Sequence, residues 1–252
     1  MTNSSRQLVA AAVVLVMGHA ASAGQSATEV IEKSLAALGG RAAHAKLQSR
    51  SATGSIALST PAGDINGTLE VLNAAPNKTR MLLKADLSAL GAGELVVDQR
   101  FDGQAGYVLD SLQGNRAITG NQLDNMQNSS FPHPFIDYKD RGTSAELAGK
   151  ENVGGRDAFV IVFDPTSGSQ VRNYIDAETF LPIKTVMKVD IPQLGQEVEQ
   201  TTEFFDYKEV DGVKVPFRIK TSSSIQTITI TLTGIEHNVK VDNALFVKPG
   251  AL

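Results

Sequence analysis

The sequence predicts a mainly β protein whose sheet is wide enough to curl strongly. After residue 50, short runs of alternating apolar and polar residues recur between turn signals. Alternation with period two is typical of strands that have one buried and one hydrated face. An open sheet of roughly ten or more strands rarely stays flat, so we expect a barrel or half-barrel.

The first group of strands is predicted before residue 111. Turn residues such as Pro61-Ala62-Gly63, Ala75-Pro76-Asn77 and Asp102-Gly103 separate the runs. Alternation is nearly strict from Asp64 to Val71, which predicts a half-buried strand. The predicted strands are 51–59, 63–72, 78–84, 93–101 and 105–110.

A second group of strands is predicted after Glu146. Its strongest local signal is Asp211-Gly212 between alternating apolar runs, because both turn positions tolerate a positive φ. The predicted strands are 145–149, 156–164, 170–176, 182–189, 196–207, 213–221 and 225–236.

Helices are predicted at the start and in the middle of the chain. Ser26 and Glu29 have capping-box spacing, and Gly39-Gly40 ends the helix that they open. A short helix at 41–47 is expected next, and Thr119 is placed to cap a mid-chain helix. A proline-stiffened apolar loop, 131–136, follows that helix. A sheet interrupted in this way suggests a cover over one of its faces.

Several segments resemble the LolA/LolB-like proteins, periplasmic carriers and sensors of lipid-modified partners. They are D-x-x-T-x-L-P at 176–182, D-Y-K-x-V-D-G-V-K-V-P-F at 206–217, a first helix ending Ala37-Leu38-Gly39-Gly40, Phe101-Asp102-Gly103 before a strand, and a closing stretch 241–246 before Pro249. The resemblance implies a strongly curved antiparallel half-barrel, with helices forming a lid over an apolar cavity for acyl chains. It covers most of 24–252, which we expect to be a single domain.

Candidate residues follow from the apolar alternation. The expected lining of the concave face is Ile65, Leu69, Val71, Met81, Leu83, Leu95 and Val97 on early strands and Phe159, Ile161, Phe163, Met187 and Phe204 on later ones. The expected lid residues are Val30, Ile31, Leu35 and Leu38 of the first helix and Leu123 and Met126 of the mid-chain helix. The alternative for each lining residue is an ordinary place in a filled core. A wide, curved sheet under two or three short helices favours a cavity.

The N-terminus predicts export. Arg6 precedes an apolar run from Leu8 to Met17, and Ala21-Ser22-Ala23 fits signal peptidase. We expect residues 1–23 to be a signal peptide cleaved after Ala23, because the apolar run is too short to span a bilayer. With no cysteine, the chain has no residue for lipid anchoring. The expected location is the periplasm or the exterior, without a permanent membrane anchor.

Composition and motifs argue against other functions. The net charge is −4, tryptophan is absent and no basic stripe is visible, so nucleic acid is not an expected partner. His44, His133 and His237 fit no zinc motif and are expected on the surface or in loops. No catalytic residue, metal site or cofactor is predicted.

We therefore expect a non-catalytic carrier or binding protein for a lipid or a lipoprotein acyl chain. The partner would be a lipid or an acylated protein, with an envelope protein as a further candidate. The alternative is an envelope sensor or interaction module with the same fold and no transported ligand. An enzyme acting on an apolar substrate is the third possibility, and it lacks a visible nucleophile and base.

Overall fold

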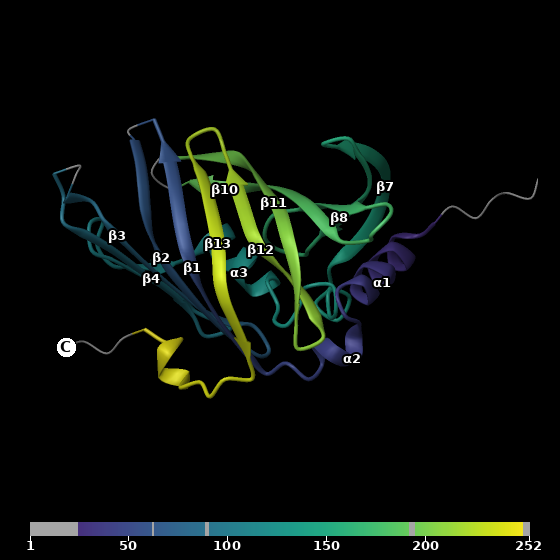
Figure 1. The fold of residues 1–252 in the computed structure, drawn as a ribbon, viewed down its shortest axis with the longest axis horizontal. Helices are drawn as coiled ribbons and strands as arrows, with labels where there is room; N and C mark the ends of the chain where they lie inside the picture. Colours follow the sequence, from purple (N-terminus) through teal and green to yellow (C-terminus); the bar gives the residue numbers. More distant parts are fainter. Residues whose placement is uncertain (1–24, 62, 89–90, 192–194, 249–252) are drawn as a thin grey trace, which may run out of the picture.

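The computed structural model describes residues 25–61, 63–88, 91–191 and 195–248 (Figure 1). In these residues thirteen strands form one antiparallel sheet that does not close on itself. The predicted cleavage site after Ala23 lies outside them. The predicted fold class, a strongly curved half-barrel with a few helices, is confirmed.

The strands occupy most of the described chain. They are β1 (Ser49–Thr60), β2 (Gly63–Ala74), β3 (Lys78–Asp86), β4 (Glu94–Phe101), β5 (Gly106–Asp110), β6 (Arg116–Ile118), β7 (Ser144–Val153), β8 (Arg156–Asp164), β9 (Val171–Asp176), β10 (Pro182–Ile191), β11 (Gln196–Val210), β12 (Val213–Ser222) and β13 (Thr227–His237). The order across the sheet is β6-β5-β4-β3-β2-β1-β13-β12-β11-β10-β9-β8-β7. The sequence did not predict β6, which has only three residues in a polar stretch.

The helices are α1 (Ala27–Ala37), α2 (Arg41–His44) and α3 (Gly120–Asn128), with a 3-10 turn, η2 (Asn243–Leu245), near the end. Ser26 and Glu29 cap α1 as predicted: the Glu29 amide donates to Ser26 Oγ at 3.2 Å, and the Ser26 amide donates to Glu29 Oε2 at 2.7 Å. Gly39 follows with φ of 116° and packs so closely on Gly212 that a Cβ would collide with its carbonyl. The end of α1 is thereby fixed to the β11–β12 turn.

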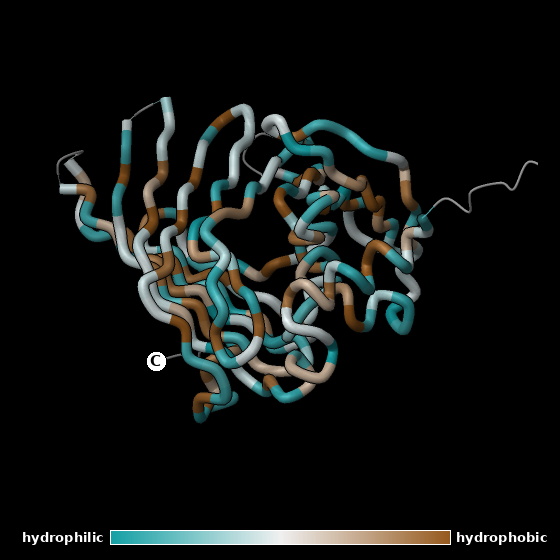
Figure 2. The backbone as a smooth tube through the Cα atoms, turned by 45° about the vertical axis from the view of Figure 1, so that its right-hand side comes forward, coloured by the Kyte–Doolittle hydropathy of each residue, from teal (hydrophilic) through white to brown (hydrophobic). Residues whose placement is uncertain are grey.

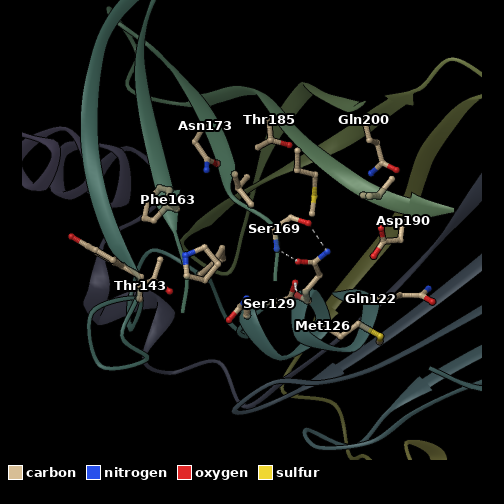
Figure 3. A pocket seen from close by; sticks show the side chains of 18 of the residues that line it. Gln122, Met126, Ser129, Thr143, Phe163, Ser169, Asn173, Thr185, Asp190 and Gln200 are labelled. Carbon is tan, nitrogen blue, oxygen red and sulfur yellow. Dashed lines mark hydrogen bonds between the residues drawn. The ribbon is translucent and has the colours of Figure 1, made fainter. Parts of the chain in front are cut away.

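The two edge strands explain where α3 lies. β6 and β7 are consecutive in the chain but sit at opposite edges of the sheet, so the segment between them must cross the open side. Gln99 of β4 donates to the Met126 sulfur at 3.8 Å, while α3 also packs against β10. α3 therefore bridges the inside of the curve (Figures 1 and 3).

Alternation assigns the two faces of the sheet. Phe204, Ile219, Ile230 and Ile56 are paired in turn across β11, β12, β13 and β1, which makes an apolar row on the concave face. The intervening positions of β13 are threonines, such as Thr229, and face the other way. Hydrophobic and hydrophilic residues accordingly alternate along the long strands in Figure 2.

Two buried clusters lie beside the first two helices. α1 packs Val30, Ile31 and Leu35 against aromatic residues of β8 and of the segment after α3. Leu47, Phe131, Val213 and Val215 form a second cluster near α2. Beside the first cluster, between α3 and the concave face of β8 to β11, the sheet is only partly covered, and a cavity lies there.

Candidate functional site

A cavity of about 920 Å³ lies between α3, the segment after it and the concave face of β8 to β11 (Figure 3). Ligand pockets in proteins usually have volumes of roughly 300 to 1,000 Å³, so this one is large enough for a lipid-sized molecule. Its position follows from the topology, because α3 crosses the half-barrel without filling it.

The apolar part of the lining comes mainly from the sheet. Phe163 of β8, Val171 of β9, Met187 of β10 and Phe204 of β11 all contribute, and Met126 of α3 is also part of the lining. Phe163 also stacks on Phe135, with ring centroids 5.2 Å apart, so one wall is rigid. The two methionines are flexible and suit a surface that adapts to ligand shape.

A polar network fixes α3 at the edge of the cavity. Ser169 Oγ accepts hydrogen bonds from the side-chain amides of Asn121 at 3.0 Å and Asn125 at 3.2 Å, and it donates to the Lys188 carbonyl at 2.6 Å. The Ser169 amide donates to Asn125 Oδ1 at 2.7 Å. Gly168 allows this approach, since a Cβ at that position would lie 2.8 Å from Asn125 Oδ1. α3 is thus held by asparagines rather than by an apolar stripe.

Charged side chains in the lining come from Arg116, Arg141 and Asp190. Arg141 is mostly paired: its Nη1 donates to the carbonyl of Asn128 at 2.7 Å and its Nη2 lies 3.2 Å from Asp137 Oδ1. Its Nε is buried without a hydrogen-bond partner among the described residues. Arg116 and Asp190 are exposed. The charge of Arg141 is therefore balanced by Asp137, and the charges of Arg116 and Asp190 lie at exposed positions rather than in the interior of the cavity.

All twelve predicted lining residues lie on the concave face. Strand pairing puts Ile65, Leu69 and Val71 of β2 on the same face as the predicted residues of β3 and β4. The same face continues through Ile56 of β1 to Phe204 of β11 and Met187 of β10. Three of them line the cavity: Phe163, Met187 and Phe204. Phe159 and Ile161 belong to the core under α1. The remainder lie on the concave face of β2 to β4, outside the cavity lining: Ile65, Leu69, Val71, Met81, Leu83, Leu95 and Val97.

The predicted lid residues lie in two environments. Val30, Ile31, Leu35 and Leu38 are all at most 2% exposed, and the first three contact the aromatic core rather than the cavity. Met126 lines the cavity, whereas Leu123 is half-buried outside the lining. Movement of either helix remains a prediction.

The expectation of surface or loop histidines was wrong for two of the three. His44 is 4% exposed, and the His237 side chain is 1% exposed. His133 is in the predicted loop, yet burial lowers its pKa to about 3. These residues are far apart in sequence and meet because α2, the loop after α3 and the end of β13 converge. No spacing motif could signal such a cluster.

Sequence reasoning also missed the polar residues of the cavity. Asn173, Thr185 and Gln200 line it from three adjacent strands. A polar residue at an inward position of an alternating strand was the available signal.

Within the described ranges, no group of three or more His, Cys, Asp or Glu side chains is arranged to hold a metal ion. In the same ranges, no helix is both long enough and apolar enough to cross a membrane.

Comparison with solved structures shows which known proteins have a similar fold. A LolA superfamily protein from Nitrosomonas europaea matches with a TM-score of 0.57 and 13% identity, covering 88% of this chain and 98% of that one. A DUF1329 family protein from Desulfovibrio piger matches with a TM-score of 0.58 and 13% identity, over 88% and 97%. An outer membrane lipoprotein-sorting protein domain from Vibrio parahaemolyticus matches with a TM-score of 0.54 and 13% identity, over 85% and 95%. This chain has the LolA-like fold.

No protein-family model matches the sequence, and no curated protein sequence does. The likeness is therefore one of fold alone, at low sequence identity.

Proposed function

We propose that this protein is an exported, non-catalytic carrier that binds a lipid, or the acyl chain of a lipoprotein, in the cavity beside α3. The observation that carries the proposal is a cavity of about 920 Å³ on the concave face, lined by Phe163, Met187 and Phe204. The similarity in fold to the lipoprotein-sorting domain from Vibrio parahaemolyticus supports the same class of ligand. Residues 1–23 would direct the chain to the periplasm, where it would act without a membrane anchor.

The expected affinity suits a carrier. Burying one methylene contributes about 0.8 kcal/mol, so ten methylenes contribute roughly 8 kcal/mol before costs. Loss of translational freedom and ordering of side chains remove several kcal/mol of this. A dissociation constant near the micromolar range or weaker follows. Such a complex can form and also release its ligand.

The lining supports binding rather than chemistry. The cavity-lining residues include no histidine or cysteine, and the hydroxyl of Ser169 is engaged by two asparagines and a backbone carbonyl. A nucleophile needs an adjacent base within hydrogen-bond reach. The described lining offers no such pair, which supports a non-catalytic role.

The alternative, an interaction module that pairs through a sheet edge, has less support. β7 is the long edge strand, but it exposes Glu146, Lys150 and Glu151 and carries a register shift between Leu147 and Gly149. Charged side chains and bulges are common protections of an edge against pairing with another chain. The edge is therefore less suited to a partner than the cavity is to a ligand.

Titration with a fluorescent probe that has an acyl chain and an uncharged head tests the proposal. We expect the wild type to bind with micromolar affinity and Phe204→Arg to lose binding, because an arginine would place a charge in the apolar lining. Phe205→Arg, on the opposite face of the same strand, is the matched control and should bind normally. Equal binding by both variants and the wild type would contradict the proposed site.

A further inference from the structure

Three polar side chains of the cavity lining form a row across neighbouring strands of the concave face. Asn173 of β9 is paired in register with Thr185 of β10, and Gln200 of β11 is paired with Met187, two residues further along β10. All three line the cavity, and Figure 3 shows them above it on neighbouring strands. They interrupt a face that is otherwise mainly apolar.

These side chains differ from the other polar groups of the site. Asn125 and Ser169 are satisfied by each other and by the backbone. Asn173, Thr185 and Gln200 make no side-chain hydrogen bond with any residue that the structure describes. Asn173 is only 8% exposed. Its carboxamide is not among the fully buried polar groups without a partner, so it remains accessible from the cavity that Asn173 lines. Asn173 is thus available to a ligand.

The neighbouring apolar groups define the rest of that ligand. Val171 and Met187 form the adjacent cross-strand pair, one pleat further along β9 and β10. A molecule lying across both pairs would meet hydrogen-bonding groups on one side and apolar groups on the other. It would therefore be an amphiphile, with its polar group directly attached to its apolar chain.

The charge of the polar group follows from the same residues. An amide and a hydroxyl donate and accept hydrogen bonds but cannot neutralise an ion. The charge of Arg141 is balanced by Asp137 and its Nη1 donates to a backbone carbonyl, although its Nε has no partner among the described residues. A carboxylate placed beside Asn173 would lose its water without gaining an opposite charge, which is unfavourable. An uncharged head with carbonyl and hydroxyl groups matches the site better.

We infer that the cavity selects amphiphiles with a neutral, hydrogen-bonding head next to the apolar chain, and that Asn173, assisted by Thr185 and Gln200, determines this selection. The inference rests on the proposed carrier function and names the class of ligand within it. Acylglycerols and fatty amides belong to this class, whereas free fatty acid anions do not.

The test compares two ligands with the same acyl chain, dodecanoyl glycerol and dodecanoate, by calorimetric titration at neutral pH. The wild type should bind dodecanoyl glycerol at least about tenfold more tightly. Asn173→Leu should weaken dodecanoyl glycerol binding about tenfold and leave dodecanoate binding unchanged. Asn66→Leu, the same substitution at an exposed position of β2, is the control and should alter neither.

The outcomes separate this inference from the carrier function. Equal binding of both ligands by the wild type, or tighter binding of dodecanoate, would overturn selection by the head and leave the carrier function standing. A parallel loss of both ligands in a folded Asn173→Leu protein would assign Asn173 to packing and overturn its role. Binding of neither ligand by the wild type would overturn both proposals. Thermal melting establishes that each variant is folded.

Discussion

The imidazole rings of His44 and His133 lie with centroids 5.7 Å apart and planes tilted by 57°. Both ring nitrogens of His44 are buried without a hydrogen-bond partner among the described residues. His133 Nδ1 accepts from the Phe135 amide at 3.2 Å. The contact joins α2 to the loop after α3, next to the partly buried cation of Arg50 on β1 and to His237 on β13.

This cluster predicts a loss of stability in mild acid. Burial lowers the pKa of His44, and burial together with His44 and Arg50 lowers the pKa of His133 to about 3. An unfolded histidine titrates near 6.5, so below that pH the unfolded chain binds more protons. Stability from His133 is complete above about 6.5 and falls as the pH drops toward 3. We expect a decrease of about 2 kcal/mol between pH 7 and pH 5.

Urea denaturation at several pH values measures this change. His133→Asn keeps an acceptor for the Phe135 amide but cannot titrate, so its unfolding free energy should vary less over the same range. An identical pH dependence in the variant and the wild type would show that His133 is not the titrating group.

Asp98 should be a major contributor to stability on the convex face. It is paired with Arg80 Nη2 at 2.8 Å and Arg100 Nη2 at 2.7 Å, and its side chain is 8% exposed. Burial opposes ionisation, but the hydrogen bonds from both arginines outweigh it and lower the pKa of Asp98. Asp98→Asn should cost about 3 kcal/mol, because two partly buried cations lose their partner.

Chemical denaturation of Asp98→Asn tests that value. Asp64→Asn, at an exposed position of β2, is the control and should change stability by no more than about 0.5 kcal/mol. Similar effects of the two substitutions would argue against the arginine pairing.

Ser169 should control how firmly α3 is held. Ser169→Ala removes an acceptor for Asn121 and Asn125 and a donor to the Lys188 carbonyl, each interaction being worth about 1 kcal/mol. The amides of 120–128 should then exchange with solvent roughly tenfold faster or more. Ser167→Ala removes a side chain two residues away, while the Ser167 carbonyl still accepts from Asn128. Equal protection of α3 in both variants would contradict this prediction.

Leu69 and Met187 should respond differently to the same substitution. Both lie on the concave face, but Leu69 is 1% exposed, whereas Met187 is half-buried and lines the cavity. Leu69→Arg buries a charge and should destabilise the fold by several kcal/mol. Met187→Arg can extend into the cavity, so we expect near-normal thermal stability and lost ligand binding. The reverse pattern would contradict the boundaries of the cavity.

The processing prediction needs an intact-mass measurement. Cleavage after Ala23 should give a periplasmic chain that begins at Gly24. A membrane fraction that retains Met1 would contradict export by a cleaved signal.

Local patterns predicted much of the fold, but less of the site. Alternation predicted that Leu69, Met81 and Phe204 lie on the concave face. With a period of two, the buried face of a strand fixes the direction of every side chain along it. Which part of that face stays open depends on where α3 and α1 cross it. Those positions are set by long-range contacts, such as Asn125 with Ser169 and His44 with His133. Partners separated by tens of residues leave no periodic signal.

The most direct test of the carrier function is mass spectrometry of the organic extract from protein purified under native conditions. We expect an amphiphile in near-stoichiometric amount from the wild type, and at least tenfold less from a folded Phe204→Arg variant. A wild-type extract without lipid, or equal amounts of the same lipid from both proteins, would contradict binding in the cavity.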